Sequence, residues 1–148
     1  MEGLSTEELT RSSELVIEGD VKDVTAEWSK DGKTIISRST IITTNIIKGK
    51  IIQEVTVEHD GGEIGDIGFH VSDVEPLRKG EKVILFLKTG ESKKYGNALK
   101  IVGNAQGKYT IGKDGIARKR GFSVITGEEK IDNNIPVEEL VDKIRRVK

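Results

Sequence analysis

The chain contains no cysteine. Disulfide frameworks, thiol nucleophiles and cysteine-ligated zinc sites are therefore excluded, although this absence does not fix the cellular compartment. Long apolar runs are missing too, since none approaches the roughly 18 residues that a membrane-spanning helix requires. The amino-terminal residues also lack the basic region followed by an apolar stretch that marks a signal peptide. If the protein is exported, we expect such a signal to have been removed.

A net charge of one sign is likewise absent, because 24 Lys and Arg oppose 25 Asp and Glu. No global field would steer the chain towards nucleic acid. At 148 residues the chain fits one domain, which should bury about 68–70% of its unfolded surface without help from a metal. Isoleucine, lysine and glutamate are plentiful, as is typical of a heat-tolerant archaeal or thermophilic source.

The first half of the chain predicts a short helix followed by long strands. Ser5 and Glu8 have the spacing of a capping box, so a helix is expected over residues 6–13. Apolar residues then alternate from residue 15, and their phase slips beyond Val21, which indicates a bulge. A turn with Asp-Gly at 31–32 leads to a return strand over 34–47. Val55 and Val57 mark the inward face of a third strand.

The second half predicts more short strands and a closing helix. The nearly continuous apolar run over 82–87 is typical of a central strand, and 90–93 is expected to turn. Further strands are expected at about 99–102, 109–111, 116–118 and 122–125. Pro136 suits the first position of a helix with an apolar stripe at Val137, Leu140, Val141 and Ile144.

Short strands separated by glycine turns, with a helix near each end, indicate a mainly β fold. The architecture predicted is a small OB-like β-barrel, closed or partly open, formed as one domain over residues 1–148. A parallel α/β fold is disfavoured, because helical patterns do not alternate with the strands.

Several sequence blocks occur in order over roughly residues 8–111, namely SSELVIEGDV (12–21), KG (48–49), GGEIG (61–65), IG (67–68), GEKV (80–83), LFL (85–87) and QGKY (106–109). Together they resemble a group of uncharacterised exported bacterial and archaeal proteins. The same pattern is similar to the netrin-type module of the tissue inhibitors of metalloproteinases. The resemblance implies an OB-like barrel and a location outside the cytoplasm. Those inhibitors chelate zinc through an amino-terminal cysteine, and this chain has none, so their mechanism is not implied.

The segment between residues 59 and 70 gathers both histidines and several carboxylates. Imidazole and carboxylate together suit a metal ion, yet the spacing matches no established zinc or calcium motif. A solvated glycine-rich loop is the simpler interpretation, so metal binding is kept as an alternative. Its candidate ligands are His59, Asp60, Glu63, Asp66 and His70.

Catalysis at this segment would need Glu63 or Asp66 buried with a raised pKa, whereas the surrounding glycines favour an exposed, bending backbone. No set of nucleophile, base and orienting group is visible, so we expect no catalytic residue. Gly61, Gly62 and Gly65 are not followed by GK[ST], so no nucleotide or other cofactor is expected. Their predicted role is to supply positive φ angles where the chain turns sharply.

The basic stretch from residue 108 to 120 is the strongest argument for nucleic acid. OB-folds bind single strands through a basic groove with stacking aromatics, but only six aromatic residues occur, as three Phe, two Tyr and one Trp. A charge run on a hairpin is more often a solvated face, so this interface is also kept as an alternative. It would use Lys108, Tyr109, Lys113, Arg118, Lys119 and Arg120.

These patterns favour a non-enzymatic module that binds a protein partner. Irregular loops on a rigid barrel commonly carry recognition, so the expected contact surface is the 61–70 segment with the adjoining turns. Its predicted contact residues are Gly61, Gly62, Glu63, Asp66 and His70.

Overall fold

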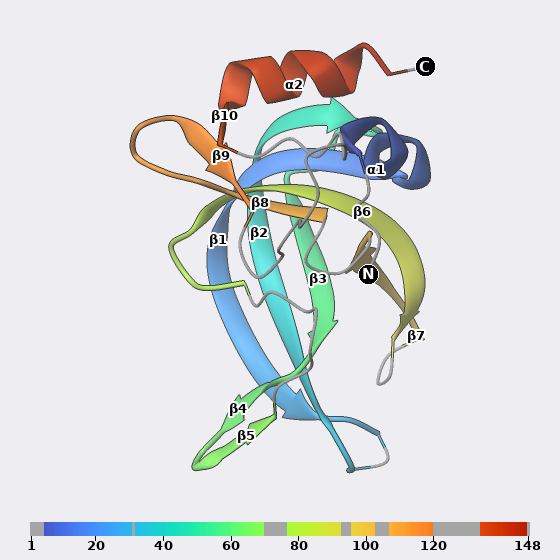
Figure 1. The fold of residues 1–148 in the computed structure, drawn as a ribbon. Coiled ribbons are helices and arrows are strands. Elements are labelled where there is room, and N and C mark those ends of the chain that lie inside the picture. The colour runs from blue at the N-terminus through green and yellow to red at the C-terminus, as the bar shows by residue number, and fades with distance from the viewer. Residues whose placement is uncertain are drawn as a thin grey trace.

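The computed structural model describes residues 5–30, 32–69, 77–92, 96–102, 107–119 and 134–147. Most of them lie in β-strands (Figure 1). The elements are α1 (Thr6–Ser12), β1 (Leu15–Trp28), β2 (Ile35–Lys48), β3 (Glu54–Asp60), β4 (Gly62–Ile64), β5 (Ile67–Phe69), β6 (Lys82–Ser92), β7 (Gly96–Ile101), β8 (Lys108–Ile111), β9 (Ile116–Arg118), β10 (Ile135–Pro136) and α2 (Val137–Arg145).

Five strands close into a barrel in the order β1-β2-β3-β7-β6, and β6 returns to pair with β1. Four of these contacts are antiparallel, and the fifth, between β3 and β7, is parallel. This confirms the predicted mainly β, OB-like barrel with a short helix near each terminus. Strands β8, β9 and β10 extend the sheet beyond β6.

Strand β6 is buried on both faces, as its continuous apolar run predicts. Val83, Leu85 and Leu87 point into the barrel, where they belong to the interior core. Ile84 and Phe86 point outward into a second core, which the helices cover. One strand therefore joins the barrel to its helical cover, which lies at one end of the molecule in Figure 1.

Strands β1 and β2 form a long ribbon that bends through irregularities in pairing. The register shifts between Val21 and Asp23, which confirms the bulge predicted from the slipped apolar phase. Gly19 lies at another shift, and a Cβ there would stand 2.5 Å from the carbonyl oxygen of Ile42. Only glycine allows the two strands to approach this closely.

The two helices begin close to where the sequence places them. Ser5 and Glu8 form the predicted capping box, and Lys48 on β2 donates to the carbonyls of Thr10 and Ser13 at 2.7 Å, which ties the end of α1 to the barrel. Helix α2 starts one residue later than predicted, because Pro136 is its N-cap. Its buried residues are Leu140, Val141 and Ile144, all on the predicted stripe.

Two local predictions are wrong, and a third concerns residues that the structure does not describe. The glycine-rich segment is a hairpin, β4–β5, rather than a loop. Gly90 to Ser92 continue β6 in register with β7, so the expected turn does not begin there. The strand predicted at 122–125 lies outside the described residues.

Neither helix of the described chain is long and apolar enough to cross a bilayer.

Candidate functional site

The β4–β5 hairpin is fixed to the barrel at its base. The Gly61 amide donates to the Ile35 carbonyl at 2.8 Å, and the Ser37 hydroxyl donates to the Gly61 carbonyl at 2.7 Å. Gly61 and Gly62 have φ angles of 95° and 145°, and Gly65 in the turn has 58°. The predicted need for positive φ is therefore confirmed at all three glycines. A Cβ on Gly62 would also lie 2.5 Å from the Ser37 hydroxyl oxygen.

Beyond its base the hairpin is exposed. Glu63 and Asp66 are open to solvent, and Ile67 keeps 53% of its surface exposed. In Figure 1 the hairpin lies at the end of the molecule away from α2, close to the tips of β1 and β2. Two carboxylates and an isoleucine therefore stand on a short ribbon whose base is held firmly. His70, the remaining residue predicted to take part, lies outside the described residues.

His59 is separated from these carboxylates by burial. It follows Val55 and Val57 on the inward face of β3, lies opposite Ser37, and is 8% exposed. Its Nδ1 lies 3.2 Å from the Asp60 carbonyl oxygen, while Nε2 has no hydrogen-bond partner among the described residues. Burial lowers the pKa of His59 below its ordinary value, and the Lys108 charge lowers it further. Protonation of the imidazole is thus less favourable than in a solvent-exposed histidine.

The predicted metal ligands do not come together where the structure describes them. His59 faces the interior, Asp60 follows it on the alternate face of the strand, and Glu63 and Asp66 are exposed on the hairpin. Within the described ranges no group of three histidine, aspartate or glutamate side chains is placed to hold an ion. Metal binding through His70 stays an untested prediction.

Sequence reasoning missed an ionic cluster on the outer face of the barrel. Glu58 on β3 has a side chain with no exposed surface, and it accepts from Arg38 on β2 at 3.1 Å and from Lys100 on β7 at 3.0 Å. Both cations keep 24% of their side chains exposed. The cluster joins β2, β3 and β7 around the parallel contact between β3 and β7. Its ion pairs therefore hold strands of the barrel together. Because Val55 and Val57 face inward, alternation along the strand puts Glu58 on the outer face of the barrel. Nothing in the neighbouring sequence indicates that its side chain is buried there.

The residues predicted for nucleic acid are divided between core and surface. Lys108 is 2% exposed and its ammonium lies 3.1 Å from the Glu81 carboxylate. Tyr109 is fully buried against Phe86, and the Lys119 ammonium lies 4.9 Å above the Tyr109 ring. Such buried groups cannot meet bases or phosphates without unfolding the strand.

The remaining members of that set offer less than the sequence suggests. Lys113 is exposed, but Arg118 forms a bidentate pair with Asp114, with nitrogen–oxygen distances of 2.7 and 3.2 Å. Arg118 also holds the pKa of Asp114 at about 2, below the ordinary 3.8. Arg120 lies outside the described residues. Nucleic-acid binding stays a prediction, carried by fewer exposed charges than expected.

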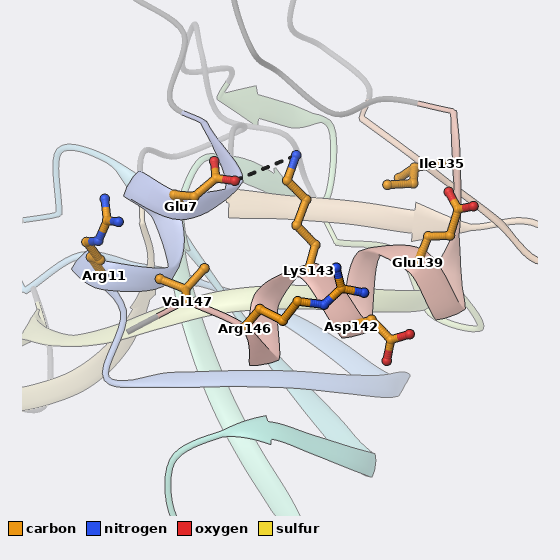
Figure 2. Close-up of a pocket in the computed structure, with 8 residues that line it drawn as sticks. All are labelled: Glu7, Arg11, Ile135, Glu139, Asp142, Lys143, Arg146 and Val147. Atoms are coloured by element: carbon orange, nitrogen blue, oxygen red, sulfur yellow. Dashed lines mark ion pairs between the residues drawn. The ribbon is translucent and has the colours of Figure 1, made fainter.

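A groove of about 800 Å³ runs between α1 and α2 (Figure 2). Its charges are mixed, and Glu7 on α1 faces Lys143 on α2 across 3.7 Å. The groove holds none of the residues predicted to form a site. Its lining residues are Glu7, Arg11, Ile135, Glu139, Asp142, Lys143, Arg146 and Val147.

The described residues that were predicted to form a site are divided between exposed positions, such as those on the hairpin, and buried positions in the fold. The hairpin brings carboxylates and an apolar side chain to solvent, whereas Glu58 and Lys108 are buried in ion pairs with other residues of the fold. Comparisons with protein-family models, with curated proteins and with solved structures find no match to this chain. The resemblance to exported proteins and netrin-type modules therefore stays a prediction.

Proposed function

We propose that the chain is a non-enzymatic module that binds a protein partner outside the cytoplasm, with the segment from Gly61 to His70 and the adjoining β1–β2 turn as its contact surface. One observation supports it most. The β4–β5 hairpin is tied to β2 by the hydrogen bonds of Gly61 at its base, yet it presents Glu63, Asp66 and Ile67 to solvent.

Firm attachment matters because binding costs free energy for every group that must be ordered. The positive φ angles of Gly61 and Gly62 aim the hairpin away from the barrel, and the Ser37 hydroxyl holds that direction. A partner would meet a preformed ribbon with an apolar centre at Ile67 and an acidic rim. Such an arrangement favours a partner surface that combines an apolar pocket with basic residues.

The location is part of the same proposal. It rests on the blockwise resemblance of residues 8–111 to exported proteins, and it directs the search for a partner to membranes and culture medium. Binding without catalysis is favoured because Glu63 and Asp66 are exposed, whereas a general acid or base at neutral pH needs burial to raise its pKa.

The test is affinity capture from native membranes and medium with three purified proteins. Wild type and an Ile51→Ser variant should retain the same partner, because Ile51 is 92% exposed in the β2–β3 connection, away from the hairpin. A variant carrying Glu63→Lys and Ile67→Ser should lose that partner, while melting at the temperature of wild type. Equal retention by all three proteins, or no partner for wild type, would refute the proposal.

A further inference from the structure

Over its outer half, strand β1 has an edge that no strand of the described chain pairs with. Its inner residues, Leu15 to Asp20, pair with β6, and Val21 bonds to the segment before β6 through the carbonyl of Glu81 and the amide of Gly80. From Asp23 to Trp28, β1 pairs only with β2 among the described residues. Residues 23–28 form this open edge.

The ladder with β2 determines which groups the open edge presents. The Ser29 amide donates to the Thr34 carbonyl, so Glu27 and Thr25 also turn their backbone groups towards β2. The alternate residues, Val24, Ala26 and Trp28, therefore direct their N–H and C=O groups away from β2. Within the described part of the chain, the Val24 amide is the one such group with a partner, and it donates to the Asp23 carboxylate at 3.0 Å.

The same alternate residues form an apolar stripe on one face. Trp28 is 40% exposed, while Val24 and Ala26 are half-buried. Proteins that remain monomeric usually protect such an edge with proline, with lysine or with a bulge. Here the bulge lies before the open edge, between Val21 and Asp23, and residues 23–28 contain neither proline nor lysine.

We propose that the open edge binds the open edge of a second copy of this chain, as an antiparallel ribbon related by a two-fold axis through Ala26. In an antiparallel pair, two residues that face each other either both direct their N–H and C=O groups at the partner strand or both direct them away. Because these orientations alternate along the strand, the two-fold axis must pass through a residue rather than between two residues. With the axis at Ala26, Val24 lies opposite Trp28 of the second copy and Thr25 lies opposite its Glu27. The exposed indole is then covered by valine.

Charge selects this register over its neighbours. An axis at Thr25 would place Asp23 opposite Glu27, and an axis at Glu27 would place that carboxylate opposite itself. Like charges directly opposite each other destabilise a strand pair. With the axis at Ala26 the nearest like charges that would face each other, Lys22 and Lys30, fall outside the open edge, at the bulge and in the turn. Of these three adjacent registers, the one with its axis at Ala26 is the register in which no carboxylates face each other.

Sedimentation of the purified chain measures the proposed dimer. Wild type should reach twice 16.3 kDa as its concentration rises, whereas Ala26→Pro should stay at 16.3 kDa. Proline at Ala26 removes an amide that points away from β2, so the fold should tolerate it. A wild type that remains monomeric throughout, or a folded Ala26→Pro variant that still dimerises, would overturn the proposal.

A cross-link tests the register and decides the matter if the proline variant fails to fold. Because the chain has no cysteine, Ala26→Cys carries a single thiol. Facing Cα atoms in a hydrogen-bonded antiparallel pair lie about 5.5 Å apart, within the roughly 4.4–6.8 Å that a disulfide spans. Mild oxidation should convert Ala26→Cys to a covalent dimer much faster than Thr56→Cys, an exposed site on β3. Equal rates for the two variants would contradict the two-fold axis at Ala26.

Discussion

Replacing Glu58 by alanine should destabilise the barrel at the contact that closes it. The carboxylate has no exposed surface and accepts from Arg38 and Lys100 at 3.1 and 3.0 Å. Removing one partner from a buried ion pair usually costs about 3–5 kcal/mol, because the other charge is left unpaired in the interior. Both cations here keep 24% of their side chains exposed and can regain water. The expected loss is therefore about 3 kcal/mol, at the lower end of that range.

The measurement is urea unfolding at neutral pH, with the free energy extrapolated to water and an unchanged dependence on denaturant. Glu58→Gln keeps an acceptor and the volume of the side chain, so its loss should be smaller, about 1–2 kcal/mol. A double-mutant cycle between Glu58→Gln and Lys100→Met should give a coupling energy of at least about 0.5 kcal/mol. A loss below about 1 kcal/mol for Glu58→Ala would refute the reasoning, since it would mean that the cluster carries no more than surface pairs do.

The remaining predictions concern pH and backbone conformation. NMR titration should place the pKa of His59 below 6.5. As the pH falls, the unfolded chain takes up this proton before the folded chain does, so the contribution of neutral His59 to stability is fully present above pH 6.5 and is lost below it. The free energy of unfolding should therefore depend less on pH in this range in His59→Gln. Asp114 should titrate at about 2, and Arg118→Gln should move it back towards 3.8; its contribution to stability is present above 3.8 and is lost as the pH falls through about 2. Gly62→Ala should cost about 1–3 kcal/mol in chemical unfolding, because φ is 145° and the Cβ would meet Ser37; Gly32→Ala, at φ 71° with no atom within 4 Å, should cost less.

Features that depend on a few neighbouring residues could be predicted from the sequence. The capping box of Ser5 and Glu8 is confirmed because its hydrogen bonds lie within a single turn. Burial of β6 on both faces followed from its continuous apolar run, and the bulge after Val21 from the slipped phase. The OB-like barrel followed from the number and spacing of such strands, together with their glycine turns.

Features that depend on contacts between distant parts of the chain could not be predicted from the sequence. Lys108 looks like a surface cation in a basic stretch, yet the fold buries it and places the carboxylate of Glu81 beside it. Gly90 looks like the start of a turn, but pairing with β7 holds it extended. For the hairpin, the positive φ angles were predicted and the strand pairing was not, since three-residue strands are too short to show alternation.

The parallel contact between β3 and β7 also bears on how the chain folds. Val57 and Leu99 are the paired residues there, and β4, β5 and β6 lie between them in the sequence. Bringing such distant segments together costs more loop entropy than forming the hairpin of β1 and β2. We therefore expect the ribbon and β3 to pair first during synthesis, and the ring to stay incomplete until β7 has left the ribosome. Until then β3 lacks its second neighbour, and we expect that edge to expose the nascent chain to aggregation.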